Sequence, residues 1–358
     1  MLALRSLPIL IVAAIALPAV AQATSIGVVA PQSGPFALLG EQMRAGATAA
    51  AEELGVEIRL IDETCEAGSG EAIARQLDEA GVAAAIGFLC SESLDGALPL
   101  LKGAGIPAIT ISVRWQVLME DALKHDWPFF RMAPTADSEA DKLANVILRE
   151  WPDEAFALIE DGTIHGRELS EAIRNALEER GMKPVFTDTY RPGQEQQIAL
   201  VRRLAKAGAS HVFVGGDRND VAIIARDAAA EGIALTLLGG DAMRAADQPV
   251  PLADGVLAVA LPNYATLPEA SRVAARLVGN GVAPEGYVLS AYAAAQVAAE
   301  ATASATESER PIAGVLTETA FETVIGKVAF TAGHELKDNP YRLQQWNGDD
   351  FTPYAQSN

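Results

Sequence analysis

The sequence predicts an α/β protein with two lobes, each built on a parallel sheet that helices cover on both faces. Strand and helix signals alternate nearly throughout the chain, a pattern typical of βαβ units. The alternation breaks at 112–128 and then starts again for a second series of similar length. The 358 residues also exceed what one compact core usually holds, so two lobes are expected.

Residues 1–23 have the pattern of a secretory signal peptide. Arg5 is their one charged residue, 7–20 form an apolar core, and a small-x-small cleavage site ends at Ala23. A membrane anchor is the alternative, but the apolar run is short and two prolines interrupt it. We expect cleavage after about Ala23, no lipid anchor because no cysteine follows that site directly, and an exported, soluble protein.

The elements of the first lobe follow this leader in order. Apolar runs bounded by turn residues predict the strands, and the segments between them predict the helices. The stretch 112–128, which holds Arg114 and Trp115, is interpreted as a structured connection. The expected strands are 25–30, 56–62, 82–87 and 106–111, and the expected helices lie near 40–54, 68–80 and 94–102.

The second series begins with a helix at 135–149 and ends in a more irregular tail. No linker rich in Ser, Pro or Gly separates the two series, so a tight connection is expected, and a last segment divided between the lobes would explain it. The expected strands are 155–160, 184–190, 211–215, 235–239 and 256–261, the helices are 166–180, 194–207, 219–231 and 286–304, and strand-like pieces are 327–330 and 341–346.

The turn after the third strand is the first candidate site. The strand at 82–87 is apolar on both faces, and it runs into a polar turn with Cys90, Ser91 and Ser93. Both serines are good N-cap residues for the following helix, whose free N–H groups and partial positive charge suit a carboxylate. Ligands of open α/β sheets bind beyond the carboxyl ends of the strands, where this turn lies.

Cys65 and Cys90 are the two cysteines of the chain, and in an exported protein they suggest a disulfide. Each follows a predicted strand, at 56–62 and at 82–87, so they would come within bridging reach if those strands are neighbours. The closed loop is worth roughly 3–4 kcal/mol in the chain-entropy model. Two buried free thiols are the alternative, while a metal site is disfavoured because two cysteines without nearby histidines supply too few ligands.

Composition and motifs exclude several functions. The net charge of −20 argues against nucleic acid and anionic membranes as partners. No Gly-x-Gly-x-x-Gly follows the first strand, and the chain has no Walker loop, nucleophile elbow or His-Glu-x-x-His. The four histidines are scattered. A binding protein without cofactor or metal is therefore favoured over an enzyme.

Several segments resemble the periplasmic leucine/isoleucine/valine-binding proteins, and their order and spacing cover essentially the whole mature chain. Residues 26–35, IGVVAPQSGP, resemble the opening of that family, and Cys65 with 86–93, IGFLCSES, resembles its two cysteines and its ligand-binding turn. The other similar segments are Gly40, Gly46, 105–110, 239–241 and 287–296.

The resemblance implies a type I periplasmic solute-binding protein of an ABC importer. Such proteins have two doubly wound lobes, joined by three crossing segments, that close on a ligand. Lobe one would comprise 24–134 and 262–328, and lobe two 135–261 and 329–358. The expected role is to capture an amino acid, or a related zwitterionic or carboxylate solute, in the periplasm and deliver it to an inner-membrane permease. A sensor of the same fold and a periplasmic enzyme are the alternatives.

The resemblance also implies ligand-binding residues. Ser91 and nearby backbone N–H groups would hold the ligand carboxylate, the carbonyl of Ser112 would accept from its ammonium, and Asp241 would pair with that ammonium. A buried zwitterion needs partners for both charges, and one bare charge would cost about 3–5 kcal/mol. The alternative for Asp241 is a turn residue after two glycines.

Departures from the family pattern concern the ligand. Leu39, His165 and Asp217 stand where leucine-binding members have tyrosines, and Arg114 stands where they have a threonine. This implies a cleft more charged than an aliphatic side chain requires. Arg114 either holds a carboxylate with two parallel hydrogen bonds or pairs with a nearby acid, and Trp115 either stacks on the ligand or packs in the connection.

Overall fold

A computed structural model describes residues 25–135, 137–246 and 249–355. The predicted signal peptide at 1–23 lies outside the described residues. Within the described part of the chain, no helix combines the length and apolarity that a membrane span requires.

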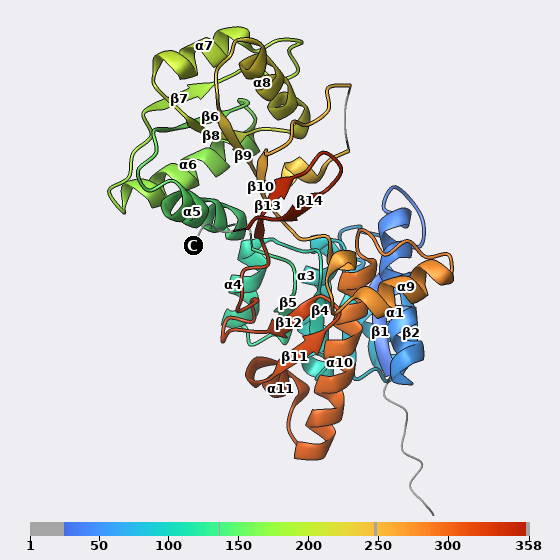
Figure 1. Ribbon diagram of the computed structural model, residues 1–358. Helices are drawn as coiled ribbons and strands as arrows, with labels where there is room; N and C mark the ends of the chain where they lie inside the picture. The colour runs from blue at the N-terminus through green and yellow to red at the C-terminus, as the bar shows by residue number, and fades with distance from the viewer. Residues whose placement is uncertain (1–24, 136, 247–248, 356–358) are drawn as a thin grey trace, which may run out of the picture.

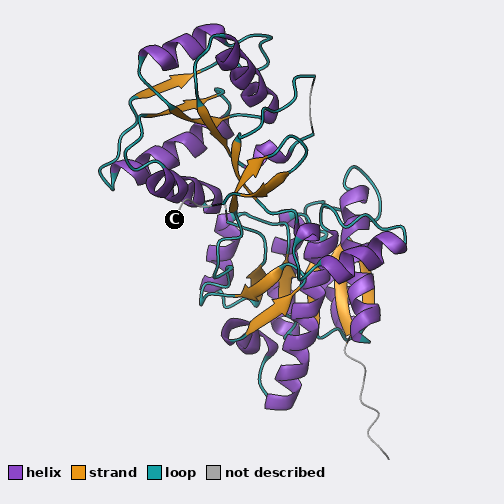
Figure 2. Cartoon of the chain, viewed as in Figure 1, coloured by secondary structure: helices purple, strands orange, loops and turns teal. Residues whose placement is uncertain are grey.

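The first sheet has five parallel strands in the order β2-β1-β3-β4-β5. Side chains of α1 pack on one face of this sheet, and those of α2, α3 and α4 pack on the other (Figures 1 and 2). The strands are β1 Ser25–Ala30, β2 Glu57–Asp62, β3 Ala84–Gly87, β4 Ala108–Thr110 and β5 Phe129–Arg131, and the helices are α1 Ala37–Leu54, α2 Gly70–Glu79, α3 Ser91–Ala104 and α4 Gln116–Lys124.

The second sheet has seven strands in the order β14-β13-β10-β9-β8-β6-β7. All pairs among strands β6 to β10 are parallel. At one edge, β13 pairs antiparallel with β10, and β14 pairs antiparallel with β13. The α5 and α6 helices cover one face, and α7 and α8 cover the other. The elements are α5 Ser138–Glu150, β6 Phe156–Glu160, α6 Ile164–Glu178, β7 Phe186–Thr189, α7 Ile198–Lys206, β8 His211–Gly215, α8 Arg218–Ala230, β9 Thr236–Gly239, η1 Asp241–Arg244, β10 Leu257–Ala260, β13 Arg342–Trp346 and β14 Phe351–Pro353.

The tail divides between the two lobes. Buried side chains of α9, α10, α11 and the β11–β12 hairpin join the core of the first sheet, whereas β13 and β14 belong to the second. The chain therefore passes between the lobes three times, after β5, after β10 and after β12, and this confirms the predicted architecture (Figure 1). The elements of the tail are η2 Tyr264–Thr266, α9 Ser271–Gly279, α10 Val288–Ser308, α11 Ile312–Glu318, β11 Ala320–Thr323 and β12 Gly326–Ala329.

The lobe boundaries at 134/135, 261/262 and 328/329 stay a prediction. The structured connection expected at 112–128 contains α4, which buries Leu118, Met119 and Ala122 at helical spacing. It leads into β5, which was not predicted because its three residues follow Trp127 and Pro128 and are not part of a longer apolar run. The short α9, α11, β11 and β14 were also not predicted.

Small residues bring α1 and α10 together on one face of the first sheet (Figure 1). The alanine-rich α10 buries thirteen of its twenty-one residues, most of them alanine. At Gly46 of α1, an added Cβ would lie 1.9 Å from the carbonyl oxygen of Val288. Backbone atoms of the two helices thus occupy the space that a side chain would need.

We predict that Gly46→Ala destabilises the protein despite the better helix propensity of alanine. The propensity gain is at most about 1 kcal/mol, while overpacking against a backbone carbonyl costs roughly 1–3 kcal/mol. Gly103→Ala in α3 is the matched control, because an added Cβ there meets no atom within 4 Å. Urea unfolding should show a lower midpoint for Gly46→Ala and an equal or higher one for Gly103→Ala. Equal stability of both variants would contradict the close approach of α1 and α10.

Candidate functional site

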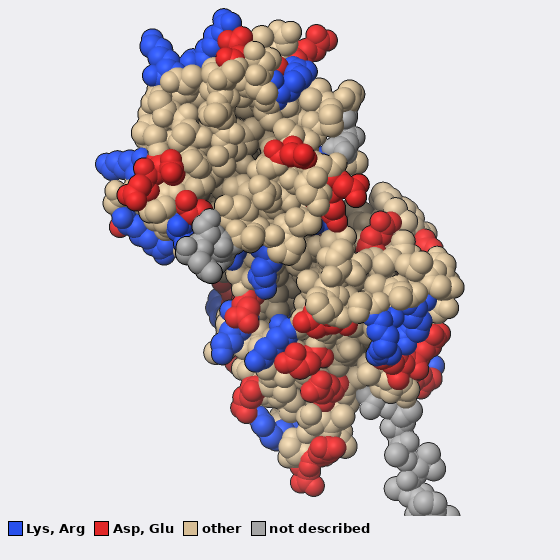
Figure 3. Space-filling model, in the orientation of Figure 1, with Lys and Arg blue, Asp and Glu red and all other residues tan. Residues whose placement is uncertain are grey.

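A cavity of about 400 Å³, here called the interlobe cavity, lies where the two lobes meet. Ile111 and Arg114, which follow β4 of the first sheet, line it together with Asp241, which follows β9, and Leu261, which follows β10. The carboxyl ends of strands from both sheets therefore converge on one space, which is where open α/β sheets bind ligands. In the space-filling view the lobes are two masses joined at a narrower waist, and acidic side chains are scattered over both (Figure 3).

The turn after β3 adopts a strained backbone. Phe88 is fully buried and has a φ of 56°, in the left-handed region that non-glycine residues rarely adopt. Its N–H donates to Val29 at 2.9 Å, and its carbonyl accepts from the Thr110 hydroxyl at 3.0 Å. Such strain costs about 1–3 kcal/mol and persists only where surrounding contacts fix it, often at binding sites.

A buried carboxylate accepts hydrogen bonds from this turn. Glu63 is 1% exposed, and it accepts hydrogen bonds from the N–H of Leu89 at 2.8 Å, from the N–H of Cys90 at 3.1 Å and from the Ser93 hydroxyl. Burial raises the pKa of the Glu63 carboxyl, while these three hydrogen bonds act in the opposite direction. Sequence reasoning missed Glu63, because its position two residues before Cys65 did not reveal that its side chain is buried.

The predicted disulfide between Cys65 and Cys90 is present, with Cα atoms 5.3 Å apart. The strands that precede the two cysteines are not neighbours, however, because β1 lies between β2 and β3. The loops after β2 and β3 must therefore reach across the end of β1 to meet. The disulfide and Glu63 together fix the segment from Leu89 to Ser93.

The predicted N-caps of α3 are wrong. The helix begins at Ser91, and the N-cap is Cys90, whose side chain makes no capping hydrogen bond. Ser93 lies inside the helix and donates to Glu63 and to the carbonyl of Cys90 at 3.0 Å. The Glu63 carboxylate accepts from the N–H groups of Leu89 and Cys90, which precede the helix, and so it fixes the entry into α3 without capping the N–H groups of its first turn.

Ser112 and Arg114 lie at the carboxyl end of β4. The Ser112 hydroxyl is 3.0 Å from the hydroxyl of Tyr287, which lines the interlobe cavity. Arg114 lines the cavity directly, and its Nη1 donates to the Tyr341 hydroxyl at 3.3 Å. Among the described residues, no carboxylate lies within 4.0 Å of the Arg114 guanidinium, although its charge acts on Glu139 from a greater distance, so both interpretations of Arg114 stay predictions.

Arg131 fixes the backbone that carries Arg114. Its side chain is fully buried, and it donates to the carbonyls of Arg114 at 3.2 Å and Trp115 at 2.9 Å. The guanidinium also pairs with Glu335 at 3.4 Å. Trp115 is 48% exposed, so it does not pack into the connection as one interpretation expected.

Asp241 enters the interlobe cavity from the second lobe. Its Oδ1 accepts from the N–H of Leu261 at 3.0 Å, and its own N–H donates to Glu139 Oε1 at 2.7 Å. Glu139 is 8% exposed, and burial, together with the negative charge of Asp241, raises its pKa. The hydrogen bond from the Asp241 N–H lowers that pKa, and so does the charge of Arg114, so Arg114 of the first lobe acts on an acidic group of the second.

The remaining predicted residues lie outside the lining of the interlobe cavity. Asp217 is the N-cap of α8, where its Oδ1 accepts from the N–H of Asp220 at 3.3 Å. His165 is exposed in the first turn of α6, and Ser91 is the first residue of α3. The structure thus brings Arg114 and Asp241 together, with Ser112 one contact away. The ligand roles of all six residues stay predictions.

Comparisons with known proteins agree with this geometry. A family model described as "Periplasmic binding protein" matches residues 23–351. An amino acid binding protein of Pseudomonas aeruginosa is 28% identical over 92% of this chain and 91% of its own length. A second P. aeruginosa protein, named for binding leucine, isoleucine, valine, threonine and alanine, is 24% identical over 92% of this chain and 91% of its own.

A solved structure shares the fold. It is that of a Rhodospirillum rubrum protein named for a branched-chain amino acid ABC transporter, and it superposes with a TM-score of 0.80 over 93% of this chain and all of the other. At 18% identity, this likeness is one of fold.

We predict that Glu63→Ala destabilises the first lobe by about 3 kcal/mol, since it leaves three donors at the start of α3 without their acceptor. Glu66→Ala on the same loop is the control, because that side chain is exposed, and it should change the free energy of unfolding by less than about 0.5 kcal/mol. Chemical unfolding of the oxidised proteins measures both. A Glu63→Ala protein as stable as the parent would show that Glu63 does not support the turn.

Proposed function

The chain belongs to the periplasmic binding protein family, and from this premise we propose that it is the substrate-binding component of an ABC importer for amino acids or related small solutes. It captures a zwitterionic or carboxylate solute between its lobes and delivers it to a permease in the inner membrane. It acts in the periplasm after removal of the leader, without catalysis and without a cofactor. The names of the two P. aeruginosa relatives support the amino-acid class.

The observation that carries the proposal is that charges of both signs line the interlobe cavity: Arg114 and Glu285 lie on the side of the first lobe, and Asp241 and Arg244 on the side of the second. An amino acid carries a carboxylate and an ammonium on adjacent carbons, so it can satisfy Arg114 and Asp241 at once. Charge-assisted hydrogen bonds of this kind are about twice as strong as neutral ones, which suits capture of a dilute solute.

The division of charges between the lobes gives a mechanism for closure. A solute bound only to the first lobe would leave its ammonium without Asp241, and a solute bound only to the second would leave its carboxylate without Arg114. Both partners engage only when the lobes lie against the same molecule. The solute therefore binds the closed arrangement more tightly than the open one and shifts the equilibrium toward it. The permease can then distinguish the solute-bound protein by its closed conformation.

In this proposal, the turn after β3 contributes less to carboxylate binding than the family pattern implies. Glu63 already accepts from the N–H groups of Leu89 and Cys90, so these donors are engaged within the protein. The remaining N–H groups at the start of α3 are those of Ser91 and its successors. We infer that Arg114 is the principal carboxylate partner and that Ser91 adds to it.

A thermal-shift screen over amino acids, amides and small carboxylates should identify the solute, since a ligand at one hundred times its Kd stabilises by about 2.7 kcal/mol. Asp241→Asn should then weaken binding of that solute by at least about 2 kcal/mol, roughly thirtyfold in Kd, because it removes the negative charge that pairs with the ammonium. Asparagine keeps an oxygen that accepts from the Leu261 N–H, so the fold should be retained. Ser91→Ala should cost roughly 1 kcal/mol. Asp153→Ala, an exposed change in the second lobe, is the control.

Calorimetric titration separates the two solute classes. A zwitterion should lose affinity in both Asp241→Asn and Arg114→Met, whereas a simple carboxylate should lose it only in Arg114→Met. If the solute binds both variants as it binds the parent, the interlobe cavity is not the binding site.

A further inference from the structure

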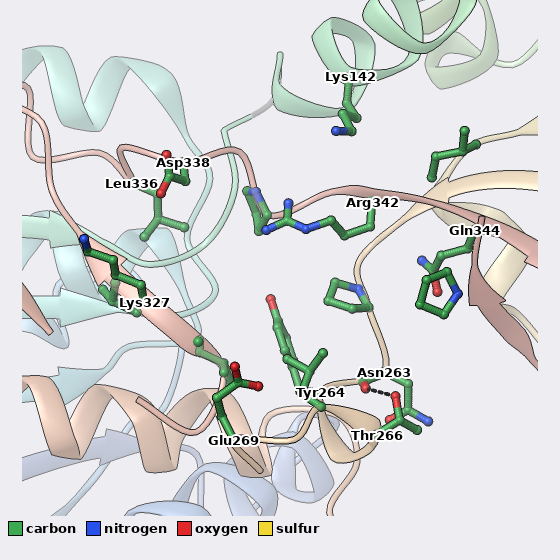
Figure 4. A pocket seen from close by; sticks show the side chains of 18 of the residues that line it. Lys142, Asn263, Tyr264, Thr266, Glu269, Lys327, Leu336, Asp338, Arg342 and Gln344 are labelled. Atoms are coloured by element: carbon green, nitrogen blue, oxygen red, sulfur yellow. Dashed lines mark hydrogen bonds between the residues drawn. The ribbon is translucent and has the colours of Figure 1, made fainter. Parts of the chain in front are cut away.

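A second and larger cavity, of about 540 Å³, adjoins the interlobe cavity, and we call it the hinge cavity. Residues of all three interlobe connections line it, including Met132, 262–264 and Leu336. Figure 4 shows Asn263, Tyr264 and Leu336 around this space. The two cavities share Met132, Pro262, Asn263, Tyr264 and Ile325, which form the wall between them. The hinge cavity contains none of the residues that the proposed solute site uses.

Positive side chains gather at this cavity although the whole chain is strongly acidic. Lys142 and Arg149 of α5 and Arg342 of β13 line it from the second lobe, and Lys327 of β12 lines it from the first. Figure 4 shows Lys142 and Arg342 directed into the open space, with the Tyr264 hydroxyl below them. Two carboxylates, Glu269 and Asp338, lie among the lining residues.

Lys142 lies near two other cations and has no carboxylate of the described residues in direct contact. Among the described residues, no carboxylate oxygen lies within 4.0 Å of its amino group, and its side chain is half-buried. Burial lowers the pKa of Lys142, and the charges of Arg342 and Arg149 lower it further. Arg342 and Arg149 are themselves exposed, so water screens part of this repulsion, and an anion placed among the three cations would relieve the remainder.

Arg342 also keeps donors available. Its Nη1 donates to the carbonyl oxygens of Asn339 at 2.5 Å and Tyr341 at 2.9 Å, while its Nε and Nη2 find no acceptor in the described part of the chain. Arg149, in contrast, is paired with Glu150 at 2.8 Å. Among the described residues, Lys142, Arg342 and Lys327 thus line the cavity with donors that have no acceptor, and Lys142 and Arg342 lie together on the side of the second lobe.

The rest of the lining is largely apolar. Leu267, Ile325, Val328, Leu336 and Phe351 line the space beyond the cations. The volume far exceeds that of a simple inorganic anion, and ligand pockets of this size are commonly apolar with a few placed polar groups. An occupant that suits both parts carries one acidic group on an apolar body.

We propose that the hinge cavity binds an organic anion, with its acidic group between Lys142 and Arg342 and its apolar body against Leu267, Ile325 and Phe351. Because both lobes line the cavity, movement of the lobes changes its shape. Its occupant therefore has different affinities for the open and closed arrangements, and it shifts the equilibrium between them.

Anilinonaphthalene sulfonate is a suitable probe, since it joins a sulfonate to an apolar body and becomes fluorescent when it leaves water. We expect the mature, oxidised protein to bind it at one site. Lys142→Met combined with Arg342→Met should weaken this binding at least tenfold. The control pair Arg191→Met and Lys206→Met removes the same charge from exposed positions outside either cavity and should leave the affinity within twofold.

Two further variants distinguish loss of the site from misfolding and from probe binding in the interlobe cavity. Lys142→Met alone removes like-charge repulsion, so it should fold at least as stably as the parent and should still weaken the probe severalfold. Arg114→Met should leave probe binding unchanged, because Arg114 lines only the interlobe cavity. The proposal fails if the double variant binds the probe like the parent, if the control pair weakens it equally, or if Arg114→Met abolishes binding. These outcomes are independent of whether the solute screen succeeds.

Discussion

The three passages of the chain between the lobes are the constraint on which the rest of the structure depends. Three covalent connections leave rotation about a common hinge as the simplest motion between two otherwise separate cores. The third connection is also held to the first sheet, because Glu335 pairs with the buried Arg131 and the N–H of Arg131 donates to His334 at 3.0 Å. Arg131 in turn holds the carbonyls of Arg114 and Trp115, so one buried cation links the hinge to the candidate site.

The first lobe supplies a rigid surface for the solute. The disulfide, the Glu63 carboxylate and the left-handed Phe88 all act within a few residues of the turn after β3. A turn fixed in this way loses little conformational entropy when a solute arrives. Two N–H groups of this turn already donate to Glu63, however, which is why Arg114 has the larger role in our proposal.

Much of the fold was predictable from sequence because its strands are apolar runs separated by amphipathic helices, and the disulfide followed from the cysteine positions. The strands β5, β11 and β14 were missed because their three or four residues carry little periodic signal, whereas the equally short β3 and β4 lie within longer apolar runs that indicated them. The site was less predictable. Glu63 and Arg131 act through burial that only tertiary packing creates, and Asp217 uses its carboxylate to cap α8. Neither Tyr264 nor the hinge cavity had a sequence signal, because residues from three distant segments form that space.

The central claim is that one solute molecule bridges the lobes and closes them. Small-angle X-ray scattering of the mature protein, with and without a saturating amount of the solute identified by screening, tests it most directly. The account predicts a smaller radius of gyration with the solute, and no such change in Asp241→Asn at the same solute concentration. An unchanged scattering profile for the parent protein at saturation would contradict it.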